Sequence, residues 1–217
     1  MLGRRYISEL KQDYQTKKPL IVKRLHEFRK VFDQGDSAIF EELCYCILTA
    51  GSSAKMGMRT VNALRDILIT GSLQDLQQRA RENHVRFWRI RPFYIVQTRE
   101  YLKNAYSFEL QTLLGSFKCS QSRRDFFATN KSIKGIAYKE ASHFLRNIGF
   151  PGYAILDKHI LNGLREMGVI NKRMSATTRK GYLTIENRLE RFAQEIDIDM
   201  DHLDLLLWSR KTGEILK

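Results

Sequence analysis

The sequence predicts an all-α protein, and three observations support this. Only three prolines interrupt the 217 residues. Most segments between the polar breaks repeat apolar residues with a period near 3.6, as amphipathic helices do. No run alternates in the way that a half-buried strand requires. A hydrophobic content of 43% supports a globular core, and the length suits one large domain or two small ones.

The first expected helices follow from this periodicity. We expect one helix to begin at Pro19, because proline is favoured in the first helical position. Residues 33–37 form a polar break, and Ser37 is expected to cap a helix over residues 38–48. Apolar residues fill nearly every position after Leu43, so we predict that this helix is the most buried.

The rest of the chain continues the helical pattern. Further helices are expected at residues 61–69, 73–80, 93–105, 122–130, 139–148, 157–167, 182–196 and 200–210. We interpret the small residues at 49–53 as a break between two helices. The break either opens a helix end towards a ligand or merely connects the helices.

Composition indicates the class of partner. Lys and Arg number 37 against 24 Asp and Glu, which gives a formal charge of +13. Such a chain favours polyanions as partners, although high solubility would also explain the charge. No apolar run reaches the roughly 20 residues that a membrane helix needs, and the N-terminus turns polar too soon for a signal peptide. We therefore expect a cytoplasmic, nucleoid-associated protein without a membrane partner.

The three cysteines, Cys44, Cys46 and Cys119, are too few for a disulfide framework and suggest a reducing compartment. Cys44 and Cys46 lie in an apolar run, which indicates burial. Their spacing fits no four-cysteine metal or iron–sulfur site, so no metal is expected.

The segment at residues 83–93 interleaves aromatic residues with arginines. This pattern suits nucleic acid, because rings stack on bases and cations meet phosphates. The alternative is that Phe87 and Trp88 are core residues of a helix end, and the segment alone slightly favours that alternative.

Residues 133–137, Ile-Lys-Gly-Ile-Ala, match the turn of a helix–hairpin–helix, whose pattern is apolar-x-Gly-apolar-Gly. Gly135 permits a backbone conformation that other residues resist. The turn and the helix start after it, including Lys134, Gly135 and Ala137, could hold a DNA phosphate through backbone N–H groups without reading sequence. An ordinary turn between packed helices remains the alternative.

Lys139 stands at the start of the following helix, two positions before a stripe of apolar residues at Ala141, Phe144, Leu145 and Ile148. A single lysine in a basic protein is most often an exposed solubility or phosphate-contact residue. However, the positive end of a helix and nearby basic groups both disfavour an ammonium ion. Both effects favour a neutral amine, which could form a Schiff base as a nucleophile.

Asp157 begins the next helix and is expected to be its N-cap. A carboxylate at this place could also stabilise a sugar cation of oxocarbenium type or assist proton transfer from the amine. Lys139 and Asp157 together therefore look like two halves of an active site.

The run from Lys134 to Gly149, KGIAYKEASHFLRNIG, followed by AILDKHIL at 154–161, resembles the prokaryotic 8-oxoguanine DNA glycosylase/lyases of the second, mainly archaeal, type. These enzymes belong to the helix–hairpin–helix DNA glycosylase superfamily. The resemblance extends through most of the chain, including ELCYCILTA at 42–50, the Arg86-Phe87 pair and DLLLW at 204–208 with the terminal KTGEILK.

This resemblance implies a role for several residues. Lys139 would attack the sugar C1′, and Asp157 would be its catalytic partner. Phe87 and Trp208 would sandwich the flipped base, and Asp204 and Lys217 would hydrogen-bond the guanine edge. The resemblance fits base chemistry, because a base inside a duplex must flip out to react and aromatic faces can receive it.

The resemblance also implies the fold and the reaction. One lobe would comprise residues 36–150 and end in the hairpin, and residues 1–35 with 151–217 would form the second lobe. DNA containing 8-oxoguanine or abasic sites would lie across the cleft, where Lys139 and Asp157 would face each other. The enzyme would act as a monomer and need no cofactor, because the amine serves as both nucleophile and electron sink.

The chain departs from the family pattern in three places. Ala137 replaces the second hairpin glycine, Gly51 stands where the family commonly has Asn, and residues 106–121 are interpreted as a grown loop. Two other functions remain open. The chain could be a glycosylase of the same superfamily for another damaged base, or a non-catalytic hairpin module in which Lys139 only contacts phosphate.

Overall fold

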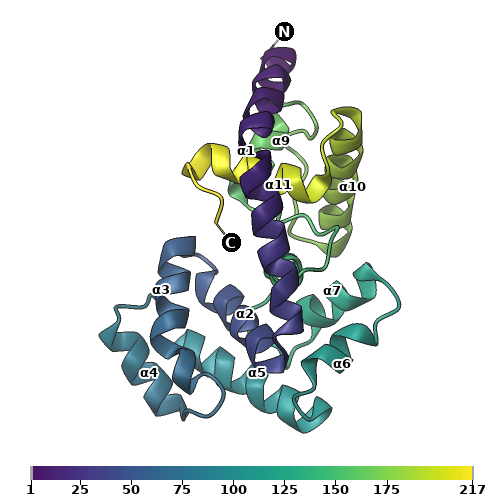
Figure 1. The fold of residues 1–217 in the computed structure, drawn as a ribbon. Helices are drawn as coiled ribbons and strands as arrows, with labels where there is room; N and C mark the ends of the chain where they lie inside the picture. Colours follow the sequence, from purple (N-terminus) through teal and green to yellow (C-terminus); the bar gives the residue numbers. More distant parts are fainter. Residues whose placement is uncertain (1, 217) are drawn as a thin grey trace. The chain divides into compact units, whose positions relative to one another are not determined.

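The computed structural model describes residues 2–216, with side chains from residue 5 onward. The chain is all-α: within these residues no strand occurs. The long helix α1 (Leu2–Asp33) comes first (Figure 1). The others are α2 (Asp36–Thr49), α3 (Ala54–Leu64), the short 3-10 helix η1 (Arg65–Ile67), α4 (Leu73–Glu82), α5 (Ile90–Tyr106), α6 (Leu110–Gly115), α7 (Ser120–Thr129), α8 (Tyr138–Asn147), α9 (Lys158–Glu166), α10 (Arg179–Glu195) and α11 (Met200–Thr212).

The prediction that the first helix begins at Pro19 is wrong, because Pro19 lies inside α1. A proline in a helix interior removes one backbone hydrogen bond and crowds the preceding turn. The buried residues Leu10, Tyr14 and Ile21 occupy one side of α1 both before and after the proline. Burial of this continuous stripe stabilises the helix through the proline, since packing outweighs local propensity in most protein helices.

The start of the next helix was also predicted wrongly. Gly35, rather than Ser37, is the N-cap residue of α2, and Ser37 lies within the first turn. Asp36 is the first residue of α2, and its carboxylate accepts the backbone N–H of Gln111 at 2.8 Å. The expected burial of the helix is confirmed, since all but one residue from Ile39 to Leu48 is buried.

Two further expectations differ from the structure. The helix expected over residues 61–69 begins earlier and ends at Leu64, before η1. The stretch interpreted as a grown loop contains α6, whose Leu110, Leu113 and Leu114 are buried. The Gln111 side chain donates to the carbonyl of Phe32 at 2.8 Å and fixes α6 beside the α1–α2 junction. The loop interpretation failed because three leucines in a short segment are enough to bury one helical face.

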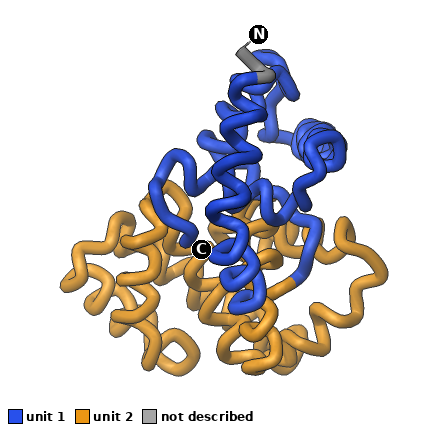
Figure 2. Tube along the Cα trace, turned by 45° about the horizontal axis from the view of Figure 1, so that its top comes forward, with its two compact units in different colours: residues 1–28, 150–217 blue, residues 29–149 orange. Residues whose placement is uncertain are grey.

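The chain divides into two compact units (Figure 2). Unit 1 consists of residues 1–28 and 150–217, and unit 2 of residues 29–149. The first boundary thus lies within α1, whereas the sequence placed it between residues 35 and 36, inside the polar break. None of the described helices is both long enough and apolar enough to cross a membrane.

Unit 2 is built around α2, which packs against α3, α5, α6 and α8. A buried polar network joins α2 to α8. The Asn147 side chain donates to the Glu42 carboxylate at 2.7 Å, and Arg146 donates to Oδ1 of the Asn147 side chain at 2.9 Å. Buried polar groups are costly unless they are paired, so these bonds fix the position of α8, whose other end carries Lys139.

Unit 1 packs α11 against α9 and α10. Two polar contacts fasten α1 to α11: the Tyr14 hydroxyl lies 2.8 Å from Nδ1 of His202, and Lys17 donates to the Ser209 hydroxyl at 3.0 Å. α11 therefore stands between the N-terminal helix and the helices that follow residue 157.

Candidate active site

The hairpin turn of unit 2 depends on Gly135. Its φ of +75° lies in the left-handed region, which favours glycine. A Cβ atom at this position would also lie 2.7 Å from Cδ2 of Tyr94 on α5. The turn therefore packs directly against α5, and both the backbone conformation and the available space require glycine.

The backbone N–H groups of the turn differ in their partners. Lys134 donates to the Thr98 hydroxyl at 3.0 Å, and Ala137 donates to the Glu140 carboxylate at 3.4 Å. Residues 134 and 135 form a tight turn that engages the Ile136 N–H, whereas the Gly135 N–H has no acceptor within the described part of the chain. The Gly135 N–H can donate to an external anion, as the sequence predicted for the hairpin.

Lys139 lies in the first turn of α8, two residues after the N-cap Ala137. The apolar stripe predicted beyond it is confirmed, since Ala141, Phe144 and Leu145 are fully buried. The Lys139 side chain keeps 35% of its surface exposed, and its Nζ lies 2.9 Å from Oε1 of Glu140. Sequence reasoning missed Glu140. Its position in the first turn of the helix, from which a glutamate can reach back to the N–H of the N-cap residue, would have been the signal.

Phe87 is not a core residue, so the alternative that the isolated segment favoured is wrong for this side chain. It lies in the turn before α5 with a φ of +61°, and 47% of the residue is exposed. The guanidinium groups of Arg86 and Arg91 lie 4.7 Å and 5.6 Å from its ring centre. An exposed ring flanked by cations is well suited to stacking on a nucleic-acid base.

The same two arginines hold the small-residue break after α2. Arg86 donates to the Gly51 carbonyl at 3.0 Å, and Arg91 donates to the Ala50 carbonyl at 2.8 Å. Burial lowers the pKa of Arg91, and the Glu140 carboxylate opposes this effect. The break therefore belongs to the same surface of unit 2 as Phe87. The sequence could not show this, because the interacting residues are far apart along the chain.

In unit 1, Asp157 is the N-cap of α9, as predicted. Its Oδ1 accepts the N–H groups of His159 and Ile160, each at 2.8 Å. These bonds satisfy two of the donors that a helix start leaves open, and they fix the carboxylate at the positive end of the helix.

Asp204 and Trp208 lie one turn apart on α11, so their side chains project from the same face of that helix. Asp204 is buried, and its Oδ1 accepts the N–H of Ile155 at 3.0 Å, which ties α11 to the segment that leads into Asp157. Trp208 is partly exposed. Lys217 lies outside the described residues, so the role expected for it has no structural counterpart here.

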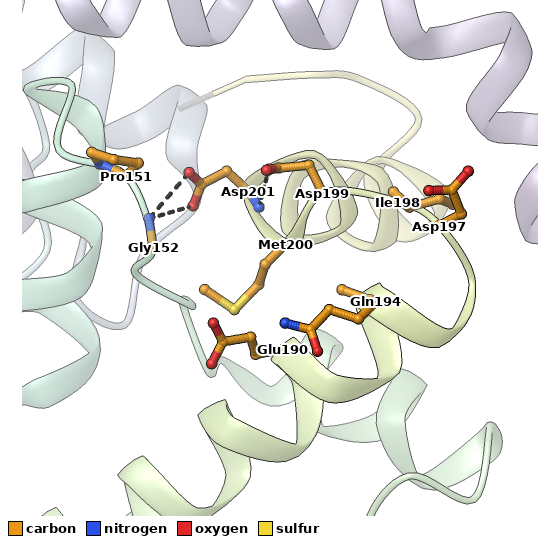
Figure 3. Close-up of a pocket in the computed structure, with 10 residues that line it drawn as sticks. Pro151, Gly152, Glu190, Gln194, Asp197, Ile198, Asp199, Met200 and Asp201 are labelled. Atoms are coloured by element: carbon orange, nitrogen blue, oxygen red, sulfur yellow. Dashed lines mark hydrogen bonds between the residues drawn. The ribbon is translucent and has the colours of Figure 1, made fainter.

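A cavity of about 450 Å³ in unit 1 lies between the start of α11 and the end of α10 (Figure 3). Its lining carries four carboxylates, from Glu190, Asp197, Asp199 and Asp201. Asp201 accepts the N–H of Gly152 with both oxygens at 3.1 Å, and Asp199 caps α11. The cavity is acidic and contains none of the predicted site residues, so it offers no surface for a polyanion.

A model of the protein family described as 8-oxoguanine DNA glycosylase matches residues 21–198. The chain belongs to this family. An 8-oxoguanine DNA glycosylase/AP lyase from Methanocaldococcus jannaschii is 38% identical over 200 residues, which are 92% of this chain and 93% of the relative. A protein of the same name from Fusobacterium nucleatum is 34% identical, with 98% of each chain covered.

Solved structures of the family agree with the fold. The M. jannaschii 8-oxoguanine glycosylase/lyase in complex with a 15mer DNA containing 8-oxoguanine has a TM-score of 0.88 and 35% identity, and it covers 97% of this chain and 99% of its own. The 8-oxoguanine DNA glycosylase of Thermotoga maritima has a TM-score of 0.87 and 31% identity, with 99% and 100% covered. The family and the helix–hairpin–helix fold expected from residues 133–161 are therefore confirmed.

Proposed function

We propose that this protein excises 8-oxoguanine from double-stranded DNA and then cleaves the strand at the abasic site. The observation that carries the proposal is full-length similarity to a glycosylase/lyase whose structure contains an 8-oxoguanine duplex. The charge of +13 and the open N–H group of Gly135 support binding to DNA.

Lys139 is the proposed nucleophile. Its amine is partly exposed at a helix start, where a substrate atom can reach it. Attack on C1′ forms a carbon–nitrogen bond while the glycosidic bond breaks and its electron pair leaves with the base. The sugar ring then opens to an imine. The imine draws electrons from C2′, which loses a proton, and the 3′ phosphate leaves by β-elimination.

Asp157 is the proposed partner that stabilises positive charge on the sugar. Its hydrogen bonds to His159 and Ile160 hold the carboxylate in place before the substrate arrives, and such preorganisation is how electrostatic catalysis operates.

Base recognition is assigned to four residues. Phe87 and Trp208 offer exposed ring surface for stacking, and Asp204 offers a carboxylate for guanine N–H donors. Lys217 completes the set by resemblance alone. Three residues of the hairpin are assigned to the contact with the DNA backbone. Lys134 would supply positive charge, and Gly135 and Ala137 belong to the turn that would contact the phosphate.

Borohydride trapping on an 8-oxoguanine duplex tests the proposal. The native protein should give a covalent adduct, Lys139→Gln should give none, and Lys118→Gln, an exposed lysine of the same unit, should behave as the native protein does. An adduct that persists in Lys139→Gln would refute the nucleophile. Absence of any adduct with the native protein would favour the non-catalytic module, and faster excision of another lesion would favour the other glycosylase.

A further inference from the structure

The pairing of Lys139 with Glu140 joins side chains at adjacent helix positions, as the Arg99–Glu100 pair of α5 also does. Side chains at adjacent helix positions point in directions about 100° apart and do not normally meet. Here Nζ of Lys139 nevertheless lies 2.9 Å from Oε1 of Glu140. The other carboxylate oxygen, Oε2, accepts the N–H of Ala137 at 3.4 Å. Glu140 thus reaches back over the helix start, and this brings its carboxylate to the amine.

The structural explanation for Glu140 is that it caps α8 and interacts with the helix dipole, both of which favour an acidic residue here. That explanation accounts for Oε2 but not for Oε1. An ion pair in which one partner is about one-third exposed contributes little stability, so stability alone gives weak reason to place Oε1 on the amine. The Glu140 side chain is only 14% exposed, whereas an ordinary surface carboxylate is solvated.

The charged groups on the elements packed against α8 have other principal partners. Arg91 of α5 interacts electrostatically with Glu140 but donates its hydrogen bond to Ala50. On α7, Asp125 accepts the Tyr138 hydroxyl at 2.7 Å, and Arg124 donates to Ser142 at 3.3 Å.

Groups from the remaining elements lie further along α8. Glu42 of α2 accepts from Asn147 at the opposite end of the helix, and the ring of Tyr45 stacks edge-on against His143 with centroids 5.6 Å apart. Among the ion pairs of the described residues, the one formed by Lys139 is with Glu140.

We propose that Glu140 is a catalytic residue that accepts a proton from the Lys139 ammonium group and so releases the amine for attack. The inference rests on the proposed role of Lys139 as nucleophile. Two of the three protons leave the lysine nitrogen on the way from the ammonium group to the protonated imine, whose nitrogen keeps the third. Glu140 takes the first when the amine is activated, and it passes the proton on, directly or through water, to the departing base.

The second proton leaves after the C1′–N bond forms and ends on O4′ as the ring opens. The sugar–base electron pair departs with the base, and nothing is oxidised or reduced, so the step needs no further reactant. This assignment divides the work between the two carboxylates: Glu140 handles the proton of the nucleophile, and Asp157 stabilises the charge of the sugar.

The rate of borohydride trapping as a function of pH, measured under single-turnover conditions, tests this proposal. Glu140→Gln keeps an oxygen for the Ala137 N–H but loses the base. General-base catalysis is typically worth about 10²–10⁴-fold, so we expect at least a tenfold slower reaction near neutral pH. The deficit should shrink as the pH rises, because hydroxide and buffer bases then remove the proton. Glu140→Asp should recover part of the rate, and Glu109→Gln, an exposed residue of the same unit, should change nothing.

Two results would overturn the inference. A deficit in Glu140→Gln that is the same at every pH would mean that Glu140 only positions the helix start, and an unchanged rate would mean that it has no part in the reaction. Thermal unfolding of the same variant shows whether the protein is folded. The proposed function has its own control, since Lys139→Gln abolishes trapping whichever result Glu140→Gln gives.

Discussion

Substitution of Gly135 by alanine tests whether the hairpin turn depends on both conformation and space. The left-handed backbone at a φ of +75° should cost a non-glycine residue about 1–2 kcal/mol. The added Cβ would also lie 2.7 Å from the Tyr94 ring, and overpacking of this kind typically costs about 1–3 kcal/mol more. The expected loss of stability is thus about 2–5 kcal/mol for Gly135→Ala.

Gly51 provides the matched control, because it lies in the same unit with a φ of +73° and a Cβ there would meet nothing within 4 Å. Gly51→Ala should therefore lose only the conformational part. For a chain of this size 1 kcal/mol corresponds to roughly 2–4 °C in Tm, so Gly135→Ala should melt about 2–12 °C below Gly51→Ala. Calorimetry or circular dichroism measures this difference. Equal melting temperatures would refute the argument that the turn packs tightly on α5.

Three other predictions concern the capping residue, the buried network and the cysteines. Asp157→Asn should keep the helix cap and lose less than about 0.5 kcal/mol of stability, yet it should slow 8-oxoguanine excision by tenfold or more. Asp157→Ala should slow excision as well and also lose about 1 kcal/mol of stability. Equal excision rates for the native protein and Asp157→Asn would contradict the catalytic role. Asn147→Ala removes the donor that lies 2.7 Å from the buried Glu42 carboxylate, and it should lower the free energy of unfolding by about 2–4 kcal/mol. Asn162→Ala, at an exposed position, should lower it by less than about 0.5 kcal/mol, and denaturant unfolding measures both. Hydrogen bonds from Ser122 lower the pKa of the exposed Cys119 thiol, and burial raises that of Cys44. Because iodoacetamide reacts with the thiolate, it should label Cys119 before Cys44 in the native protein, and the labelling of Cys119 should slow as the pH falls. Mass spectrometry measures the labelling of each cysteine. Equally fast labelling of Cys44 would show that the core opens.

Local sequence patterns predicted the structure correctly wherever the environment of a segment follows from its own residues. The stripe at Ala141, Phe144 and Leu145 predicted one buried face for α8, and that face is buried. Asp157 was predicted to cap α9 because a carboxylate before an apolar run satisfies the open N–H groups, and it does so. The turn at Gly135 was predicted from its short motif, because a left-handed residue in a tight turn restricts the choice of side chain.

The errors arose where distant residues determine the local structure. Pro19 was interpreted as a helix start, but burial of Leu10 and Ile21 carries α1 through it. Residues 106–121 were interpreted as loop, but Gln111 is held by Asp36 and Phe32, far away in sequence. The segment at residues 83–93 taken alone slightly favoured a core position for Phe87, but the residue lies in the turn before α5 and is 47% exposed.

The stretch from Lys134 to Asp157 therefore indicated by itself the family, the proposed nucleophile and its proposed partner. These depend on residue types at fixed spacing along consecutive helices. The tertiary structure alone decided which charged groups of other helices act on the start of α8. The Glu140 carboxylate contacts both Lys139 and the Ala137 N–H within the first turn of α8, and Arg91 of α5 interacts electrostatically with it. The spacing of residues along the chain determines which side chains share a helix face. The fold determines which charged groups of other helices lie near that face.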